Sequence, residues 1–353
     1  MKRVAIIACD NGLGHVRRCY LVGLELARCG ILVDLFAPVK SFEKFKTLFA
    51  SHENLRKIDF STGTSAEKLI NSDQFSMYWH ERLPDISQYH TVVSDNLPEI
   101  LHIRPDALLS GHFFWHNVLN NLSEEYRLAS QALIERCNPI VIATELFASE
   151  IVRSCPKYTP VGLYINGNQS LDALNGDALL ITGGNTPVLR SGLQKYIQEI
   201  LRHGSCIFGT VYIDPDLLHS ADKGYDGLDE GDAFKDRRYE LPDWIKIATY
   251  DDAMYKQVAV AICRPGIGTI TDLLQHGGRA ICVYESGNKE MAENARRLEA
   301  MGLGLLVGDF DRLDKLGTEI MNKNGGVNNA FASALCKLNF EGSTKTAQIV
   351  MNH

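Results

Sequence analysis

A pattern that occurs twice constrains the fold of this chain more than any other feature. An apolar run of strand length is followed by a glycine-containing loop and then by a helical pattern. The first copy starts at residues 4–9 and the second at residues 178–182. Continuous apolar runs are typical of parallel strands covered on both faces. We therefore predict an α/β fold with two doubly wound, Rossmann-like sheets.

Further apolar runs continue the alternation of strands and helices in both halves. They cover residues 31–37, 91–94, 107–110, 140–143, 206–212, 245–248, 258–263 and 279–284. A chain of 353 residues is near the upper limit for one hydrophobic core. A looser stretch rich in Gly, Asn, Pro and Tyr, 156–176, lies between the halves. We predict one domain over 1–156, a second over 157–335, and a C-terminal helix within 336–353 that returns to the first domain.

Charge and cysteine content narrow the function classes. The net charge is -7 with acidic and basic residues interspersed, so a general affinity for nucleic acid is not indicated. The nine cysteines show no CxxC pair and are expected to be reduced core thiols. No apolar run approaches the roughly 18 residues that span a bilayer, and the N-terminal run is too short for a signal peptide. We expect a cytoplasmic protein.

The loop after the first strand contains a candidate general base. Gly12 and Gly14 allow the backbone to turn tightly, and His15 opens the helix that follows. A helix N-terminus disfavours the imidazolium, which keeps the ring able to accept a proton. Arg17 occupies the position of the third glycine in GxGxxG, so a dinucleotide site is disfavoured. The alternative is that His15 caps the helix or binds a neighbouring loop.

An acidic residue, Asp95, ends the apolar run at 91–94. A carboxylate in this position can hold the Nδ1 proton of a nearby histidine and raise its basicity. It can equally cap the segment that follows. The spacing leaves both interpretations open.

The second half contains a candidate phosphate loop. Gly266, Gly268 and Thr269 lie where a helix begins, so backbone N–H groups are free for a phosphate. Asp272 follows one turn later and is placed to accept hydrogen bonds from ribose hydroxyls. The alternative is a glycine-rich turn with a solvated aspartate. Residues 183–186 form a further candidate phosphate loop.

Taken together, these loops resemble the GT-B glycosyltransferases, especially the MurG-like family and its UDP-glycosyltransferase relatives. Residues 12–18 resemble the G-x-G-H-x-x-R motif, whose histidine is the proposed base, and Asp95 resembles the acid that pairs with it. Residues 263–272 are similar to C-R-S-G-x-x-T-x-x-E, and 288–295 end in the family's N-A pair. The resemblance covers most of the chain and implies two facing domains with a cleft between them.

The resemblance also implies a set of site residues. The catalytic pair is His15 and Asp95, and the phosphate or cleft residues are Gly12, Gly14 and Arg18. The base pocket is lined by Thr249 and Tyr250, mainly through their backbone. The full donor-binding set is Gly184, Asn185, Thr249, Tyr250, Arg264, Gly266, Gly268, Thr269, Asp272 and Glu290.

Two segments depart from MurG. Glu290 and Met291 stand where MurG has a glutamine pair, and Glu290 is either a reader of a sugar hydroxyl or an exposed surface residue. Residues 111–117 replace the acceptor-side H-E-x-N loop. The candidate acceptor residues there are His112, Phe114 and Trp115, with aromatic core packing as the alternative. The donor sugar and the acceptor stay open.

The expected function is metal-independent, inverting transfer of a sugar from a nucleotide diphosphate donor, a UDP-sugar, to an acceptor hydroxyl. The acceptor is a glycan, a lipid-linked molecule or a small molecule, and no cofactor or metal is expected. The D-x-D matches at 214–216 and 309–311 lie outside the glycine-rich loops. The main alternative is a PseG-like nucleotide-sugar hydrolase, which uses water in place of the acceptor. A 2-epimerase and a non-catalytic binding protein are less favoured.

Residues 41–57 contain three phenylalanines and several basic residues. This composition suits either a basic amphipathic helix in weak contact with the inner face of a membrane or an ordinary domain helix.

Overall fold

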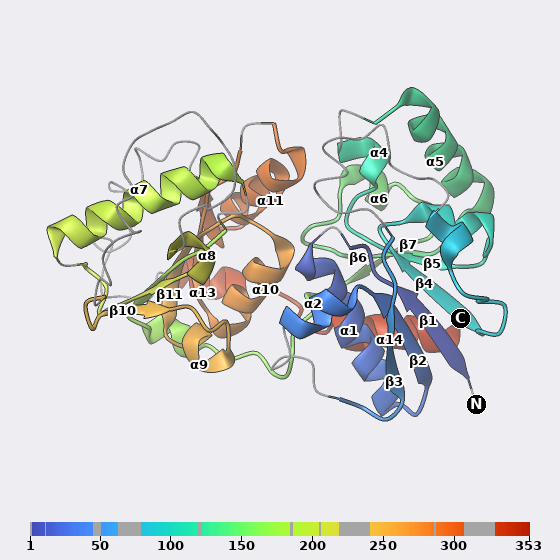
Figure 1. The fold of residues 1–353 in the computed structure, drawn as a ribbon, viewed down its shortest axis with the longest axis horizontal. Coiled ribbons are helices and arrows are strands. Elements are labelled where there is room, and N and C mark those ends of the chain that lie inside the picture. The colour runs from blue at the N-terminus through green and yellow to red at the C-terminus, as the bar shows by residue number, and fades with distance from the viewer. Residues whose placement is uncertain are drawn as a thin grey trace. The chain divides into compact units, whose positions relative to one another are not determined.

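The computed structural model describes residues 2–10, 12–44, 51–62, 79–118, 122–183, 186–204, 206–218, 241–285, 287–306 and 329–353. The chain divides into two compact units, of which the first comprises Met1–Gly167 and Leu338–His353 and the second Asn168–Lys337. Each unit contains one sheet, with seven strands in the first and six in the second (Figure 1). All strand pairs within the two sheets are parallel, which confirms the predicted fold class.

The first sheet has the strand order β3-β2-β1-β4-β5-β6-β7. The strands are β1 (Arg3–Ile7), β2 (Leu32–Ala37), β3 (Leu55–Asp59), β4 (Thr91–Asp95), β5 (Leu108–Ser110), β6 (Val141–Thr144) and β7 (Tyr158–Val161). The order reverses between β1 and β4, which are neighbours in the sheet. In doubly wound folds, ligands bind beyond the carboxyl ends of the two strands at such a reversal.

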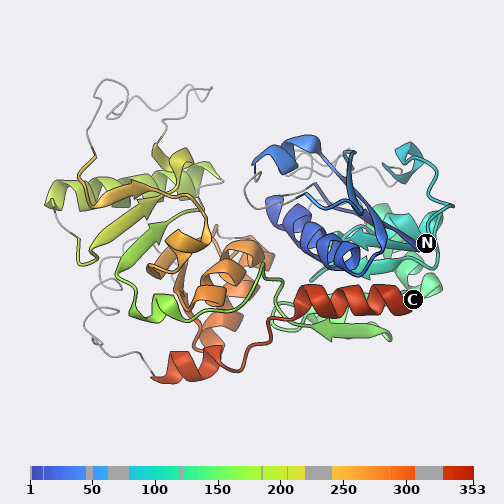
Figure 2. The same ribbon diagram turned by 90° about the horizontal axis from the view of Figure 1, so that it is seen from below.

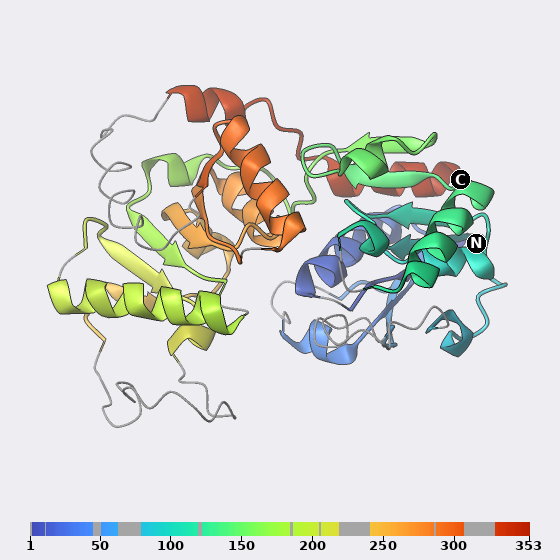
Figure 3. The same ribbon diagram turned by 90° about the horizontal axis from the view of Figure 1, so that it is seen from above.

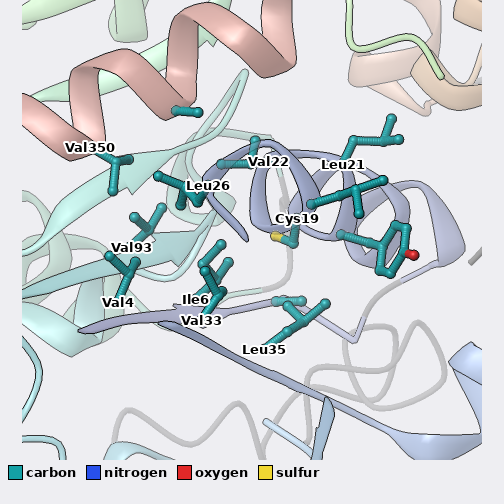
Figure 4. Packing of buried hydrophobic residues seen from close by; sticks show 14 of the residues in the cluster. Val4, Ile6, Cys19, Leu21, Val22, Leu26, Val33, Leu35, Val93 and Val350 are labelled. Atoms are coloured by element: carbon teal, nitrogen blue, oxygen red, sulfur yellow. The ribbon is translucent and has the colours of Figure 1, made fainter. Parts of the chain in front are cut away.

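Both faces of this sheet are covered, which explains the continuous apolar strands. Val4 and Ile6 face the helices α1 (Leu13–Arg28) and α14 (Gly342–Asn352). Figure 4 shows α1 side chains packed over Ile6, and Figure 2 shows α14 lying along α1. Ala5 and Ile7 face the other side, together with η2 (Pro98–His102) and α5 (Glu124–Cys137). Each strand therefore contributes apolar side chains to two cores.

The second sheet has the order β10-β9-β8-β11-β12-β13. Its strands are β8 (Ala178–Ile181), β9 (Thr210–Ile213), β10 (Ile245–Ile247), β11 (Val258–Cys263), β12 (Arg279–Cys282) and β13 (Gly304–Leu306). The order reverses between β8 and β11. Helix α7 (Pro187–His203) covers one face (Figure 3). Helices α10 (Ile267–His276) and α11 (Lys289–Ala300) bury Leu273 and Leu298.

The first unit extends further along the chain than the predicted boundary at residue 156. Strand β7 pairs with β6, so the residues up to Gly167 belong to the first unit. The proline in β7 suits the edge of a sheet, where its missing N–H costs no ladder hydrogen bond. The chain returns at Leu338, and this returning segment pairs with residues just after β7. Leu163 N–H donates to the Asn339 carbonyl (2.7 Å), and Gly342 N–H donates to the Leu163 carbonyl (3.0 Å).

Residues 41–57 do not form one continuous helix. Phe42, in α2 (Val39–Lys44), is buried in the core of the first unit. Arg56 and Lys57 lie in β3, where Arg56 Nε donates to Asp34 Oδ1 (2.7 Å). Lys57 Nζ lies 5.3 Å from the centre of the Phe42 ring. The described part of this segment therefore fits neither of the two helical interpretations over its full length, and residues 45–50 lie outside it. Within the described ranges, no helix is long and apolar enough to cross a bilayer.

Candidate functional site

The carboxyl ends of β1 and β4 bring His15 and Asp95 together. His15 lies in the first turn of α1, which Gly12 precedes with a φ of 101°. Its Nδ1 lies 2.6 Å from Asp95 Oδ2. Because the fully buried carboxylate accepts the Nδ1 proton, the ring presents Nε2 as the nitrogen that can accept a proton. Neither side chain caps a described helix, since α1 and η2 begin without side-chain caps.

A buried arginine binds the other oxygen of this carboxylate. Arg18 Nε donates to Asp95 Oδ1 (3.0 Å), and a terminal nitrogen of the same side chain lies 2.8 Å from His112 Nδ1. Burial alone would raise the pKa of Asp95, but the charges of Arg18 and His15 hold that pKa below its ordinary value. The predicted role of Arg18 in a phosphate or cleft surface does not fit, because its side chain is only 7% exposed. Arg18 instead holds the Asp95 carboxylate in position and favours its charged form.

The three candidate acceptor residues are all buried. The Trp115 ring lies 6.1 Å from the His15 ring, and Phe114 stacks on His116 at 5.6 Å. His112 contacts Arg18, as described above. Phe114 and Trp115 both belong to the buried core of the first unit, as the core alternative predicts, and Trp115 lies in that core beside the His15 ring.

In the second unit, a three-residue loop joins β11 to α10. Gly266 is the N-cap residue; it has no side chain to cap the helix, and the first turn has no acidic residue. Gly268, Thr269 and Asp272 are all partly exposed on this helix. The first amide groups of α10 therefore have the arrangement that binds a phosphate.

A buried asparagine holds the loop before α10 in place. Asn294 Nδ2 donates to the Pro265 carbonyl (3.1 Å) and is 3% exposed. This contact gives a physical reason for the asparagine of the N-A pair.

Gly183, which follows β8, packs closely against the same loop. A Cβ at Gly183 would meet Arg264 N at 2.7 Å, and Gly183 has a φ of 101°. Only glycine fits there. Gly184 and Asn185 lie outside the described residues.

Three side chains from neighbouring strand ends meet in a cluster that the sequence did not reveal. Asp214 Oδ2 accepts hydrogen bonds from Thr182 Oγ1 (2.8 Å) and Tyr250 Oη (2.5 Å). Its Oδ1 accepts a hydrogen bond from the Asp216 N–H (2.9 Å). In the D-x-D match at 214–216, the first carboxylate therefore binds the backbone of the second aspartate. Burial, followed by the charge of Asp214, raises the pKa of Tyr250. This phenol points to the cluster, so of Tyr250 only the backbone is left for the base pocket that the resemblance implies.

Tyr250 has a φ of 55°, a strained conformation for a tyrosine. We predict that Tyr250→Phe lowers the free energy of unfolding by about 2 kcal/mol, because Asp214 loses a donor. The affinity for UDP should fall several-fold as the backbone relaxes. The matched control is Tyr212→Phe, whose hydroxyl donates to Gln257 (3.1 Å). Urea unfolding and UDP titration measure both effects. Equal UDP affinity in the two variants would contradict a role for Tyr250 in the donor site.

The remaining predicted donor residues lie at the same edge of the second sheet. Arg264 follows β11, and its Nε lies 3.8 Å from Glu285 Oε2. Glu290 lies in the first turn of α11 and is partly exposed. Among the described residues, no group of three or more His, Cys, Asp and Glu side chains is placed to hold a metal ion.

Comparisons with known proteins match the second unit to a glycosyltransferase domain and the fold of the whole chain to solved glycosyltransferases. Residues 193–339 match the model of the glycosyltransferase family 28 C-terminal domain. A sequence search of curated proteins finds no match. The fold is similar to that of MurG from Acinetobacter baumannii, with 15% identity, a TM-score of 0.60 and 100% of both chains covered. It is similar to CalG4, the calicheamicin glycosyltransferase, with 14% identity and a TM-score of 0.61 over 99% of this chain and 98% of that one. It is also similar to UGT89C1 from Arabidopsis thaliana in complex with UDP, with 11% identity and a TM-score of 0.64 over 100% and 99%.

Proposed function

We propose that this chain, which is a glycosyltransferase with the GT-B fold, transfers a sugar from a UDP-sugar to an acceptor hydroxyl with inversion and without a metal ion. The match of residues 193–339 and the fold of both units carry the assignment to the glycosyltransferases. The observation that supports the chemistry is the contact between His15 and Asp95 at the reversal of the first sheet.

In the proposed reaction, His15 Nε2 removes the proton from the acceptor hydroxyl. Asp95 stabilises the imidazolium that forms, and Arg18 keeps the carboxylate ionised and in place. The hydroxyl oxygen bonds to the anomeric carbon while the bond from that carbon to the diphosphate oxygen breaks. Attack from the face opposite the diphosphate inverts the configuration.

The departing diphosphate is stabilised, in this proposal, by the first amide groups of α10. The dipole of this ten-residue helix favours negative charge at its N-terminus, near Gly266 and Thr269. The helix terminus takes the part that a cation takes in metal-dependent transferases. The UDP bound in the Arabidopsis relative supports UDP as the nucleotide.

The proposal names one class of donor, the UDP-sugars, but leaves several classes of acceptor. Structures with this fold include MurG, a calicheamicin glycosyltransferase and a plant protein complexed with quercetin, and names this varied support no single acceptor. We propose a hydroxyl acceptor on a glycan, a lipid-linked molecule or a small molecule.

We propose the cytoplasm as the site of reaction. The nine cysteines lie in the described part of the chain and none forms a disulfide, which suits a reducing compartment.

Incubating the purified protein with UDP-sugars, with and without cell extract, tests the proposal. We expect UDP release that depends on the extract, because the extract supplies the acceptor. Release of free sugar without extract would instead assign the PseG-like hydrolase activity. Binding of UDP-sugar with no turnover in either condition would leave only a binding protein.

A further inference from the structure

A charged pair in the second unit has no hydrogen bond between its members. Arg264 follows β11, and Glu285 lies three residues after β12; these strands are neighbours, with Cys263 paired to Cys282. Arg264 Nε and Glu285 Oε2 are 3.8 Å apart. A charge-assisted hydrogen bond has a length of about 2.7–2.9 Å. Arg264 Nε and both carboxylate oxygens of Glu285 are buried, and none has a hydrogen-bond partner in the described part of the chain.

Such a carboxylate is unusual, because buried polar atoms almost always have hydrogen-bond partners, and here the ion pair with Arg264 is the only polar interaction of these atoms among the described residues. Another acid at this edge, Asp214, accepts three hydrogen bonds. The side chains of Arg264 and Glu285 are 25% and 19% exposed through their other atoms, so the pair lies at the protein surface, and a ligand would reach the covered atoms as the two side chains turn apart. The unpartnered atoms therefore point to a bound group rather than to core packing.

The 3.8 Å between Arg264 Nε and Glu285 Oε2 fits one bridging hydroxyl group. Its oxygen would donate to Glu285 and accept from Arg264, and two hydrogen bonds of about 2.7 and 2.9 Å span roughly 4 Å when they meet at a right angle. The pair lies at the carboxyl edge of the sheet, next to the loop that leads to Gly266 and α10. A sugar joined to a diphosphate at α10 would bring several hydroxyl groups to this edge.

We propose that Arg264 and Glu285 bind a hydroxyl group of the donor sugar and so select among UDP-sugars. This inference rests on the proposed function, in which the second unit binds the donor. A site built to hydrogen-bond a hydroxyl rejects donors that lack it or hold it in another orientation. Glu285 is thus a specificity-determining residue separate from Glu290.

Calorimetric titration with UDP, UDP-glucose and UDP-galactose tests the assignment in the wild type and in Glu285→Gln. We expect Glu285→Gln to weaken binding of the preferred UDP-sugar roughly ten-fold, since a hydrogen bond to a charged group is lost. The affinity for UDP should stay within two-fold, because UDP lacks the transferred sugar that the pair is proposed to bind. The ratio of affinities for the two UDP-sugars should approach one. The matched control is Asp172→Asn, which removes an exposed ion pair of the same 3.8 Å length with Lys256.

The outcomes distinguish failure of the sugar-binding role of Arg264 and Glu285 from failure of the proposed function. An equal loss of affinity for UDP and for the UDP-sugar would mean that Arg264 and Glu285 support the loop before α10, and it would overturn the inference. Unchanged affinities for both ligands would overturn it as well. A wild type that binds neither UDP nor UDP-sugar would overturn the proposed function itself, and this inference with it. If Glu285→Gln fails to fold, as judged by thermal melting, Arg264→Lys gives the same comparison.

Discussion

His15→Ala should lower sugar transfer by roughly 10²- to 10⁴-fold while leaving the affinity for UDP within two-fold of the wild type. The variant removes the nitrogen that, in the proposed reaction, accepts the proton of the acceptor hydroxyl. The proposed donor loops lie in the second unit, so UDP binding should not depend on this ring. Initial rates of UDP release and UDP titration measure the two quantities.

The control for this variant is His90→Ala. His90 is an exposed histidine of the same unit, and its Nδ1 accepts from the Arg3 N–H (3.1 Å). It should keep the wild-type rate. Full activity in His15→Ala would remove the imidazole from the mechanism and leave the strand-end contact with Asp95 as a structural one.

Asp95→Asn should reduce both activity and stability. Arg18 would become a buried cation without a counter-charge, which costs about 3–5 kcal/mol of unfolding free energy. Turnover should fall by roughly 10²- to 10⁴-fold, because the imidazolium loses its stabilising charge and His15 its fixed tautomer. Urea unfolding and initial rates measure these losses.

A matched acid separates the two effects. Asp34, in β2, accepts hydrogen bonds from Arg56 and Tyr89 and lies outside the His15 contact. Asp34→Asn should lower stability and keep the turnover of the remaining folded protein. If Asp95→Asn lost stability alone, Asp95 would have no part in catalysis.

The stability difference between wild type and Asp95→Asn should depend on pH in a defined direction. The folded-state pKa of Asp95 is lowered from 3.8, so its charge stabilises the fold at pH values above the unfolded-state pKa. That contribution is lost as pH falls through the still lower folded-state pKa. The part of the difference that comes from the Asp95 charge should therefore be fully present at about pH 5 and shrink as pH falls below 3.8.

The apolar runs predicted most of both sheets because a buried parallel strand must be apolar on both faces. The three strands that were missed are short or polar. In β3, Leu55 alone is buried; β7 contains a proline; and β13 has only three residues. Sequence patterns carry little signal for such strands, since their neighbours in the sheet rather than their own composition define them.

The spacing left the contact between His15 and Asp95 open, and the resemblance implied it. The contact forms because Asp95 ends β4 and His15 opens the helix that follows β1, the neighbouring strand. The burial of Arg18 did not follow from the sequence. A helical pattern places a charged residue on the polar side, and its partner is 77 residues away in the chain. The Asp214 cluster was missed for the same reason, because it joins residues from three strand ends that only the fold brings together.

The pairing of Leu163 with Asn339 makes the second unit an insertion within the first, leaving and rejoining it at one place. An exchange of donor specificity between relatives would therefore have to transplant residues 168–337 as an internal cassette and retain the host's last sixteen residues. A chimera joined at a single point would take α14 from the donor parent, and with it the Val350 and Ala347 side chains that fill the host core. Deleting the cassette and linking Gly167 to Leu338 should, by the same logic, give a first unit that folds by itself.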